Sequence, residues 1–271
     1  MKAARRLLVV LAVAAAWPAH AVQETAETYQ GAAAETFLQK ARISAPTEMK
    51  TGITLPKRVT LVLDGVTRYG LFKDIDEYKP GMTRKADGTL DLEYQDSWQT
   101  EIAAYVVDRI IGLGLVPATV ERRFNAKVGS LQWFVRSEMT EAVRLAKRIA
   151  PPDVEAWNRA MLKVRLFDQL IANVDRNLGN ILVTKEFEVR LVDHSQSFRP
   201  IRELKAPGDL TRFSKSLLEG IRRLEEKDLK KRAGKYLRDE QIDRLLLRRD
   251  AILALAAKHI ADRGEAAVIY P

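Results

Sequence analysis

The sequence predicts an α+β fold in two lobes, with a smaller β-rich lobe followed by a larger α-rich one. Three observations support this prediction. A β-hairpin pattern surrounds the Asp64-Gly65 turn, apolar residues recur at helical spacing after Thr140, and residues 164–198 combine a helix, a polar loop and a short hairpin. The chain has 271 residues, of which 46% are hydrophobic and 30% charged, so one two-lobed domain with a sizeable core is expected.

Residues 1–21 have the features of a secretory signal peptide. They contain a positively charged start, an apolar core at residues 7–17 and a small-residue cleavage site that ends at Ala21. The apolar run is too short to span a bilayer as a stable helix, and no other segment of the sequence has the required length and character. We therefore expect cleavage after Ala21 and a periplasmic or secreted protein, with an uncleaved N-terminal anchor as the alternative.

The absence of cysteine excludes disulfides, thiolate zinc sites, cysteine nucleophiles and a lipoprotein anchor. Export without disulfides is more typical of a bacterial periplasm than of a disulfide-rich extracellular scaffold. Removal of the leader lowers the formal net charge from +9 to +6, which is compatible with anionic partners without requiring them. Basic residues between 222 and 235 alternate with acidic ones and lack interleaved aromatics, so we expect a solvated helix face and no nucleic-acid binding.

The smaller lobe is expected at residues 58–138, after an N-terminal extension at residues 22–57. The extension has a short helical pattern at residues 32–43 that is broken at Pro46. The strands of the lobe are predicted at residues 58–63, 67–73, 115–120 and 129–135. Polar residues 74–95 are expected to form an inserted loop near the site.

Two charged residues of this lobe occupy defined positions in its predicted elements. Lys73 closes the second strand, and Glu101 lies in the first turn of a helix that is predicted to run from Ser97 to Ile111. Taken singly, Lys73 is explained as a solvated surface residue at the end of a strand. Glu101 is explained as a carboxylate that the helix macrodipole favours in the first turn. Residues 136–139 are the expected hinge to the next lobe.

The larger lobe is expected at residues 139–271. Its helices are predicted at residues 141–149, 154–174, 215–224, 227–236 and 240–261. Between the second and third of these, a short hairpin is predicted from strands at residues 180–184 and 188–192. The hairpin follows the polar loop at residues 175–180, so loop and hairpin form one local unit.

Three oxygen-bearing side chains meet in this local unit. Asp175 lies on the loop, Asn180 begins the first strand and Asp193 follows the second strand, so Asn180 and Asp193 share the open end of the hairpin. Hard oxygen ligands without a histidine pair suit Mg²⁺ or Mn²⁺ better than zinc. The alternative is that Asp175 and Asn180 are turn residues and Asp193 caps a strand end.

Three motifs carry a resemblance to a known superfamily. The pattern D-R-N-L-G-N followed by V-D-H-S, together with GLFK ending at Lys73 and WQTEIAAY around Glu101, resembles the protein-kinase-like superfamily. It is most similar to the branch that holds the phosphatidylinositol 3- and 4-kinases, the HipA toxin kinases and the secretory-pathway kinases of the four-jointed group. The chain differs from ordinary protein kinases because it lacks a full Gly-rich loop and has no His before Asp175.

The resemblance implies phosphoryl transfer from ATP to a hydroxyl of a protein, lipid inositol or sugar, with Mg or Mn. Lys73 would contact the α- and β-phosphates and Glu101 would hold it. Asn180 and Asp193 would bind the metal, and Asp175 would accept the proton of the attacking hydroxyl or orient it.

Gly65 and Gly70 are the candidates for backbone contacts to the phosphates, as part of an anion-binding hairpin. The hairpin turn is the simpler explanation for both glycines. They are therefore cofactor-binding candidates alongside Lys73.

Two other functions remain open at this stage. A compartment outside the cytoplasm normally holds little ATP, so a non-catalytic kinase-like binding module of the cell envelope is the main alternative. A divalent-metal phosphohydrolase built on Asp175 and Asp193 would usually have more carboxylate or histidine ligands. Retention of five polar site residues favours the kinase, since a purely structural cleft needs none of them.

Overall fold

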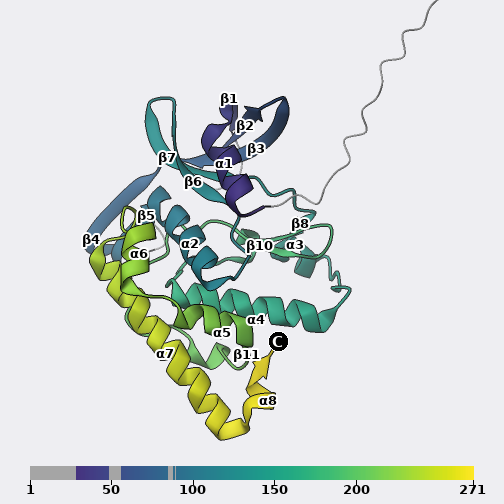
Figure 1. Cartoon of the computed structure of the whole chain (residues 1–271), viewed down its shortest axis with the longest axis vertical. Coiled ribbons are helices and arrows are strands. Elements are labelled where there is room, and N and C mark those ends of the chain that lie inside the picture. Colours follow the sequence, from purple (N-terminus) through teal and green to yellow (C-terminus); the bar gives the residue numbers. More distant parts are fainter. Residues whose placement is uncertain (1–28, 49–55, 85–87, 89) are drawn as a thin grey trace, which may run out of the picture.

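The computed structural model describes residues 29–48, 56–84, 88 and 90–271. These residues form a mixed α/β fold in which a curled antiparallel sheet and its helices lie above a mainly helical lobe (Figure 1). The predicted α+β class and the order of the two lobes are confirmed.

A five-stranded antiparallel sheet forms the upper lobe, with strand order β1-β2-β3-β7-β6. Its strands are β1 (Arg42–Glu48), β2 (Lys57–Leu63), β3 (Val66–Lys73), β6 (Thr119–Phe124) and β7 (Lys127–Trp133). The predicted hairpin between β2 and β3 is confirmed. Asp64 and Gly65 both have positive φ at its turn, the conformation of a two-residue type I′ connection. This hairpin brings Lys73, the last residue of β3, to the lower edge of the sheet.

The segment before residue 58 contains a strand that the sequence analysis missed. The helix expected at residues 32–43 is α1 (Ala32–Lys40), and Ile43 already lies in β1. Pro46 does not end the structure here, because it lies at the register shift of an edge strand. A proline is tolerated at such a position since its missing N–H leaves no ladder bond unmade in the sheet interior.

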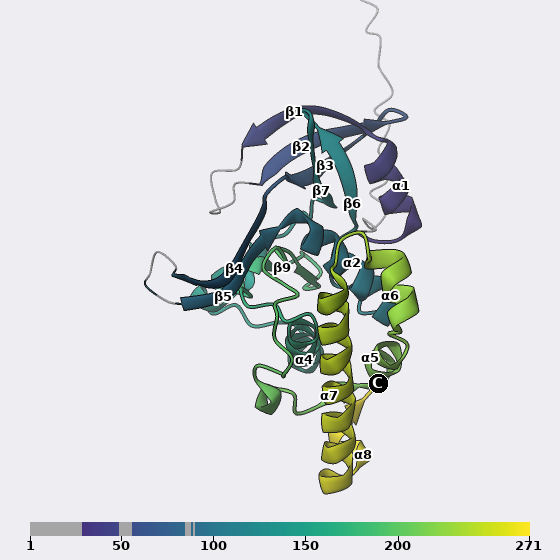
Figure 2. The same ribbon diagram turned by 90° about the vertical axis from the view of Figure 1, so that its left-hand side faces the viewer.

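Residues 74–95, expected to be a loop, instead form most of a two-stranded ribbon of β4 (Asp76–Arg84) and β5 (Leu90–Ser97). The ribbon extends away from the body of the molecule (Figure 2). Nearly every residue of β4 is exposed, so neither face of that strand needed an apolar side chain. In β5, Leu90, Leu92 and Tyr94 do alternate with polar residues. The polar residues and turn formers around them favoured a loop instead, and that prediction was wrong.

Helix α2 (Trp98–Ile111) is the main helix of the upper lobe and confirms the prediction. The Ser97 hydroxyl caps its N-terminus by accepting a hydrogen bond from the Gln99 amide at 3.1 Å, and Gly112 ends it in the left-handed conformation. Its far end packs closely on the lower lobe: a Cβ added to Gly220 would lie 1.9 Å from the Ile111 carbonyl oxygen. Helix α2 therefore packs against both lobes.

The lower lobe contains the long helices that the sequence predicted. Its helices are α3 (Glu141–Ala146), α4 (Val154–Leu170), α5 (Lys215–Arg222), α6 (Glu226–Ala233), α7 (Asp239–Arg263) and α8 (Glu265–Val268). Helix α4 ends four residues before the expected Val174, because Ala172 has a φ of 47° and turns the chain out of the helix. This early end lengthens the loop that carries Asp175.

Short strands complete the lower lobe and connect it to the upper one. They are β8 (Met139–Thr140), β9 (Ile181–Val183), β10 (Val189–Leu191), β11 (Phe213–Ser214) and β12 (Ile269–Tyr270), with single helical turns at Leu178–Asn180 and Pro207–Asp209. The predicted hairpin is the pair β9–β10, and β8 adds a third strand to it. The predicted hinge at residues 136–139 is anchored by a hydrogen bond from the Glu138 amide to the Val183 carbonyl at 2.9 Å.

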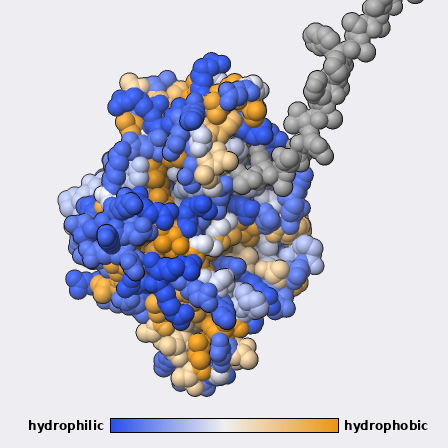
Figure 3. All heavy atoms as spheres, viewed as in Figure 1, coloured by the Kyte–Doolittle hydropathy of each residue, from blue (hydrophilic) through white to orange (hydrophobic). Residues whose placement is uncertain are grey.

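No helix within the described ranges combines the length and apolar character needed to cross a membrane. The face drawn in Figure 3 is mostly covered by hydrophilic residues, with hydrophobic ones between them. Buried apolar side chains, among them Phe72, Leu131 and Phe167, form one core that runs through both lobes.

The connection after α2 is organised by Asp108, which is fully buried. Its carboxylate accepts hydrogen bonds from the backbone amides of Gly114, Leu115 and Val116 at 3.1, 2.8 and 2.9 Å. These amides therefore donate to a side chain and not to a neighbouring strand. For this reason the strand expected at residues 115–120 begins only at Thr119.

Replacing Asp108 by alanine should lower the free energy of unfolding by about 2–4 kcal/mol, because three backbone amides, of which that of Val116 is buried, lose their acceptor. Urea denaturation measures this change. Asp243→Ala, at an exposed position of α7, is the control and should change the free energy by no more than about 0.5 kcal/mol. Equal effects of the two substitutions would contradict the role given to Asp108.

Candidate active site

The candidate site is built around the ammonium group of Lys73. Its Nζ lies 2.5 Å from Glu101 Oε1 and 2.6 Å from Asp193 Oδ1. The three residues come from the end of β3, the first turn of α2 and the second position after the β9–β10 hairpin, so the cluster joins both lobes. The ion pair that the sequence analysis expected between Lys73 and Glu101 is therefore present.

Burial and charge act against each other in this cluster. Burial alone would lower the pKa of Lys73, but the carboxylates of Glu101 and Asp193 outweigh it and hold that pKa above its usual range. Burial would likewise raise the pKa of Glu101, which is 2% exposed, but Lys73 and contacts with His194 hold it well below its usual range. Lys73 and Glu101 are therefore both charged at neutral pH.

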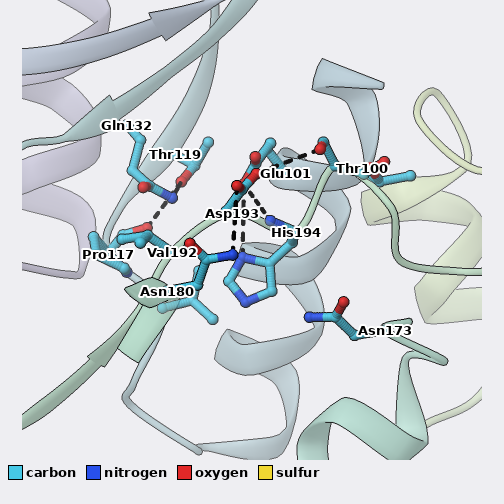
Figure 4. Close-up of polar contacts among 12 residues, drawn as sticks. Thr100, Glu101, Pro117, Thr119, Gln132, Asn173, Asn180, Val192, Asp193 and His194 are labelled. Atoms are coloured by element: carbon cyan, nitrogen blue, oxygen red, sulfur yellow. Dashed lines mark hydrogen bonds and ion pairs between the residues drawn. The ribbon is translucent and has the colours of Figure 1, made fainter. Parts of the chain in front are cut away.

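Asn180 and Asp193 lie side by side at the open end of the β9–β10 hairpin, as the sequence predicted. Ile181 pairs with Leu191, and the Val192 amide donates to the Asn180 carbonyl at 3.1 Å. The two side chains approach within 3.5 Å, from Asn180 Nδ2 to Asp193 Oδ2 (Figure 4). Asp193 has a φ of 62°, which turns the chain sharply where its carboxylate meets Lys73.

Asp175 lies on the loop between α4 and the hairpin. Its amide donates to Asn173 Oδ1 at 3.0 Å, and its carbonyl accepts from the Asn177 amide at 2.8 Å and from Asn180 Nδ2 at 3.5 Å. The backbone of Asp175 is therefore connected directly to Asn180, five residues later.

Arg176, next to Asp175, stabilises this loop through several hydrogen bonds. Its guanidinium donates to both carboxylate oxygens of Asp168 on α4, with Nε 3.0 Å from Oδ2. It also donates to the carbonyls of Asn180 and Val192 at 3.2 and 2.6 Å. One side chain thus connects the loop to the helix before it and to both ends of the hairpin after it, so Arg176 has a structural role here.

Gly65 and Gly70 lie away from the side-chain cluster, within the β2–β3 hairpin. Gly65 forms the turn with a φ of 76°. Gly70 is in the middle of β3, and a Cβ added there would lie 2.7 Å from Leu131 Cδ1. Packing on β7 therefore accounts for Gly70, and contact of either glycine with a phosphate stays a prediction.

Two buried residues of the site were not among the sequence candidates. His194 is fully buried; its amide donates to Glu101 Oε2 at 3.0 Å and its ring packs edge-on against Phe167. Neither ring nitrogen has a hydrogen-bond partner among the described residues, and burial lowers the pKa of the ring. His194 is therefore neutral at pH 7. Its contribution to the site is the hydrogen bond from its backbone amide to Glu101.

Asp96, at the end of β5, is the second residue that the sequence analysis missed. It is 3% exposed, and its Oδ1 has no hydrogen-bond donor among the described residues. Burial raises the pKa of Asp96, against the influence of Ser195 and Lys73, and the carboxylates of Asp193 and Glu101 raise it further. The strand that carries Asp96 was not predicted, so no sequence pattern placed this residue near Lys73.

The donor set fits a hard divalent cation bound together with phosphates. Asn180 and Asp193 offer oxygen ligands, and the orphaned Oδ1 of Asp96 adds an unmatched acceptor nearby. Within the described part of the chain, no group of three or more His, Cys, Asp or Glu side chains forms a self-sufficient metal cage. Mg²⁺ commonly binds through one or two carboxylates plus substrate phosphates and water, so this sparse set suits it.

Comparison with known proteins identifies the fold. No protein-family model and no curated protein matches this sequence. Among solved structures, hydra Fam20 with sugar matches with a TM-score of 0.64 at 16% identity, over 87% of this chain and 90% of that one. The Golgi casein kinase with Mn/ADP bound matches with a TM-score of 0.60 at 14% identity, over 87% and 77%.

A bacterial structure belongs to the same set. The Helicobacter pylori proinflammatory kinase CtkA matches with a TM-score of 0.52 at 13% identity, over 83% of this chain and 98% of that one. At these identities the likeness establishes the fold, which is protein-kinase-like. The expected fold is confirmed, whereas the expected branch of the superfamily stays a prediction.

The charges of the cluster predict how stability responds to substitution and to pH. Lys73→Ala leaves Glu101 buried without its cation, so the free energy of unfolding should fall by about 3–5 kcal/mol at pH 7. In the wild type the lowered pKa of Glu101 adds stability above the usual carboxyl pKa of about 4.3, which is lost as the pH falls through the folded value. Urea denaturation between pH 3 and 7 measures both effects.

Lys127→Ala is the matched control, since that lysine pairs with Asp74 at the surface and should contribute less than about 1 kcal/mol. In Lys73→Ala the acid-side slope should become shallower, because Glu101 no longer has its main charged partner. An unchanged slope in Lys73→Ala would contradict the charge assignment.

Proposed function

We propose that this protein is an exported atypical kinase that transfers the γ-phosphoryl group of ATP to a hydroxyl acceptor. The observation that carries the proposal is the Lys73–Glu101–Asp193 cluster at the junction of the lobes in a protein-kinase-like fold, in which the Lys73 and Glu101 side chains are at most 10% exposed. A cleft with a purely structural role does not need three converging charges, since burying them costs several kcal/mol per ion. Phosphoryl transfer needs such groups because its catalysis consists mainly of positioning and charge neutralisation.

Lys73 has the role of phosphate ligand in this proposal. Its ammonium is charged, is held between two carboxylates and lies at the edge of the sheet that faces the lower lobe. Glu101 fixes the position of the ammonium group, and the His194 amide fixes the second oxygen of Glu101. Lys73 is therefore pre-organised to bind the α- and β-phosphates.

Asn180 and Asp193 are the proposed metal ligands, with Asp96 as a further acidic group close to the cation. When bound, Mg or Mn neutralises the charge of the phosphates. In this structure, Asp193 Oδ1 accepts a hydrogen bond from Lys73, and Asn180 Nδ2 approaches Asp193 Oδ2. The Asn180 amide group and the Asp193 carboxylate thus lie close together before any ligand arrives, which limits the reorganisation that binding requires.

Asp175 is the proposed catalytic residue that accepts the proton of the attacking hydroxyl or orients it. Its backbone is bonded to Asn180, so the loop aims both side chains from one rigid turn. Arg176 holds this turn through Asp168 and two carbonyls. Gly65 and Gly70 are retained as candidates for backbone contacts to the phosphates.

The acceptor and the location belong to the same proposal. Two structurally similar proteins are a Golgi casein kinase and a hydra Fam20 solved with sugar, which makes protein and sugar hydroxyls the first acceptors to test. The N-terminal pattern supports export with cleavage after Ala21. That pattern lies outside the described residues.

A thermal-shift titration tests nucleotide binding directly. ATP with Mg²⁺ or Mn²⁺ should stabilise the wild type by about 2.7 kcal/mol at 100 times Kd, which corresponds to a rise in Tm of about 5–10 °C. Asp193→Ala should lose the metal-dependent part of the shift, because its carboxylate is the main protein ligand.

Asp209→Ala, on an exposed turn of the lower lobe, is the matched carboxylate control and should keep the full shift. No shift of the wild type at millimolar nucleotide would overturn the kinase proposal and favour a non-catalytic binding module. A full shift in Asp193→Ala would remove that residue from the metal site.

Export is tested by N-terminal sequencing of the protein from envelope fractions. Val22 is the expected first residue, since the small-residue site ends at Ala21. An intact Met1 in those fractions would contradict cleavage and favour an uncleaved anchor.

A further inference from the structure

Three side chains of α7 form a stripe of hydrogen-bond donors along one face of the helix. Gln241, Arg244 and Arg248 are spaced at three and four residues, so they lie above one another. Their acceptors are the carbonyls of Phe198, Pro200 and Ile201, in the segment that follows Asp193. We call residues 194–201 the post-Asp193 segment.

Arg248 is the unusual member of this stripe. It is 0% exposed, and among the described residues no carboxylate forms an ion pair with it. Burial lowers its pKa to about 10, which leaves it charged at neutral pH. Removing a cation from water costs several kcal/mol, so a buried arginine without a carboxylate partner needs another source of compensation.

That compensation comes from backbone carbonyls of two functional segments. Arg248 Nε donates to the Leu170 carbonyl at 2.8 Å, and Nη1 donates to the Ile201 carbonyl. Leu170 is the last residue of α4, where carbonyls lack helical partners and the helix dipole favours a cation. Arg248 therefore acts as a charged cap at the point where the loop carrying Asp175 begins.

The two segments that Arg248 joins also contact each other. The Phe198 amide donates to the Ile171 carbonyl at 2.6 Å, one residue after the carbonyl that Arg248 binds. Ala172 then turns the chain toward Asp175 with its positive φ. Arg248 thus lies next to the point where the Asp175 loop and the post-Asp193 segment contact each other.

The opposite side of the post-Asp193 segment is held by the upper lobe. The Ser195 carbonyl accepts from the Ser97 amide and the Thr100 hydroxyl, both at 3.0 Å, and the Ser197 carbonyl accepts from Gln95 at 3.2 Å. Gln241 donates to Gln95 as well as to Phe198, which connects the two sets of contacts. The segment is therefore fixed through its carbonyls from both sides.

We propose that Arg248 is a positioning residue that holds the Asp175 loop and the post-Asp193 segment in one fixed relation. The inference rests on the proposed function, because Asp175 and Asp193 matter together only if they act on one nucleotide. Arg248 lies on α7 and binds only carbonyls, so it acts through the backbone of the site and not on the substrate. Removing it should misplace the two carboxylates relative to each other.

The test uses three variants of the full chain. Arg248→Met removes the charge and both donors at similar volume, and Arg248→Lys restores a charged donor. Arg249→Met is the matched control, because Arg249 lies next to Arg248 on α7 and donates to the Leu224 carbonyl at the end of α5, away from the site. All are assayed well below their melting temperatures, with ADP release from ATP and Mg²⁺ or Mn²⁺ as the probe of turnover.

Arg248→Met should lower kcat about 10- to 100-fold with a smaller change in the KM for ATP, since a displacement of about 1 Å can cost that much in rate. Arg248→Lys should recover part of kcat, and Arg249→Met should stay within about twofold of wild type. A kcat of Arg248→Met equal to that of Arg249→Met would overturn the inference, as would a loss in Arg248→Lys as large as in Arg248→Met.

Hydrogen exchange separates this inference from the proposed function. In the absence of nucleotide, Arg248→Met should speed amide exchange at residues 171–176 and 194–201, and Arg249→Met should not. Exchange that is unchanged there would overturn the inference even if the wild type is a kinase. Faster exchange in Arg248→Met, combined with a wild type that shows no turnover, would support the positioning role of Arg248 and refute the kinase proposal. If Arg248→Met does not fold, Arg244→Met, which loses the Pro200 bond and an ion pair with the exposed Glu240, provides both readouts with smaller effects.

Discussion

The contact of the Lys73 ammonium with two carboxylates is the constraint on which the site depends. Three charges from three distant parts of the chain converge, with the side chains of Lys73 and Glu101 nearly or fully buried and that of Asp193 one third exposed, and Lys73 and Glu101 compensate each other. Such a cluster is stable only when β3, α2 and the end of the β9–β10 hairpin keep their relative positions. The ion pairs therefore join the two lobes as well as preparing a phosphate-binding group.

Backbone hydrogen bonds hold the elements that the charges connect. Asp108 collects the amides after α2, Arg176 binds carbonyls on either side of the β9–β10 hairpin, and Arg248 binds carbonyls at the start of the catalytic loop and beyond Asp193. In each case a charged side chain that is largely or fully buried forms hydrogen bonds with main-chain groups of irregular segments. Irregular segments with functional side chains are thereby made as rigid as the helices around them.

The parts predicted from the sequence are those encoded locally. Asn180 and Asp193 are joined by one hairpin, so their proximity followed from turn and strand patterns, and the long helices followed from apolar periodicity. The pairing of Lys73 with Glu101 was expected only through resemblance, because no local pattern links a strand end to a helix 28 residues later. Asp96 and Arg248 were missed since their neighbours are distant in sequence. Strands β4 and β5 were missed because β4 is mostly polar and the alternation of Leu90, Leu92 and Tyr94 in β5 is short and lies among turn formers.

A crystal structure of the protein with Mn²⁺ and a non-hydrolysable ATP analogue is the most direct test of the central claim. The account predicts anomalous density for Mn²⁺ beside the Asp193 and Asn180 side chains. It also predicts Lys73 in contact with phosphate oxygens while its bond to Glu101 is kept. An Asp193 carboxylate still bonded to Lys73, with nucleotide absent or bound elsewhere, would contradict the account.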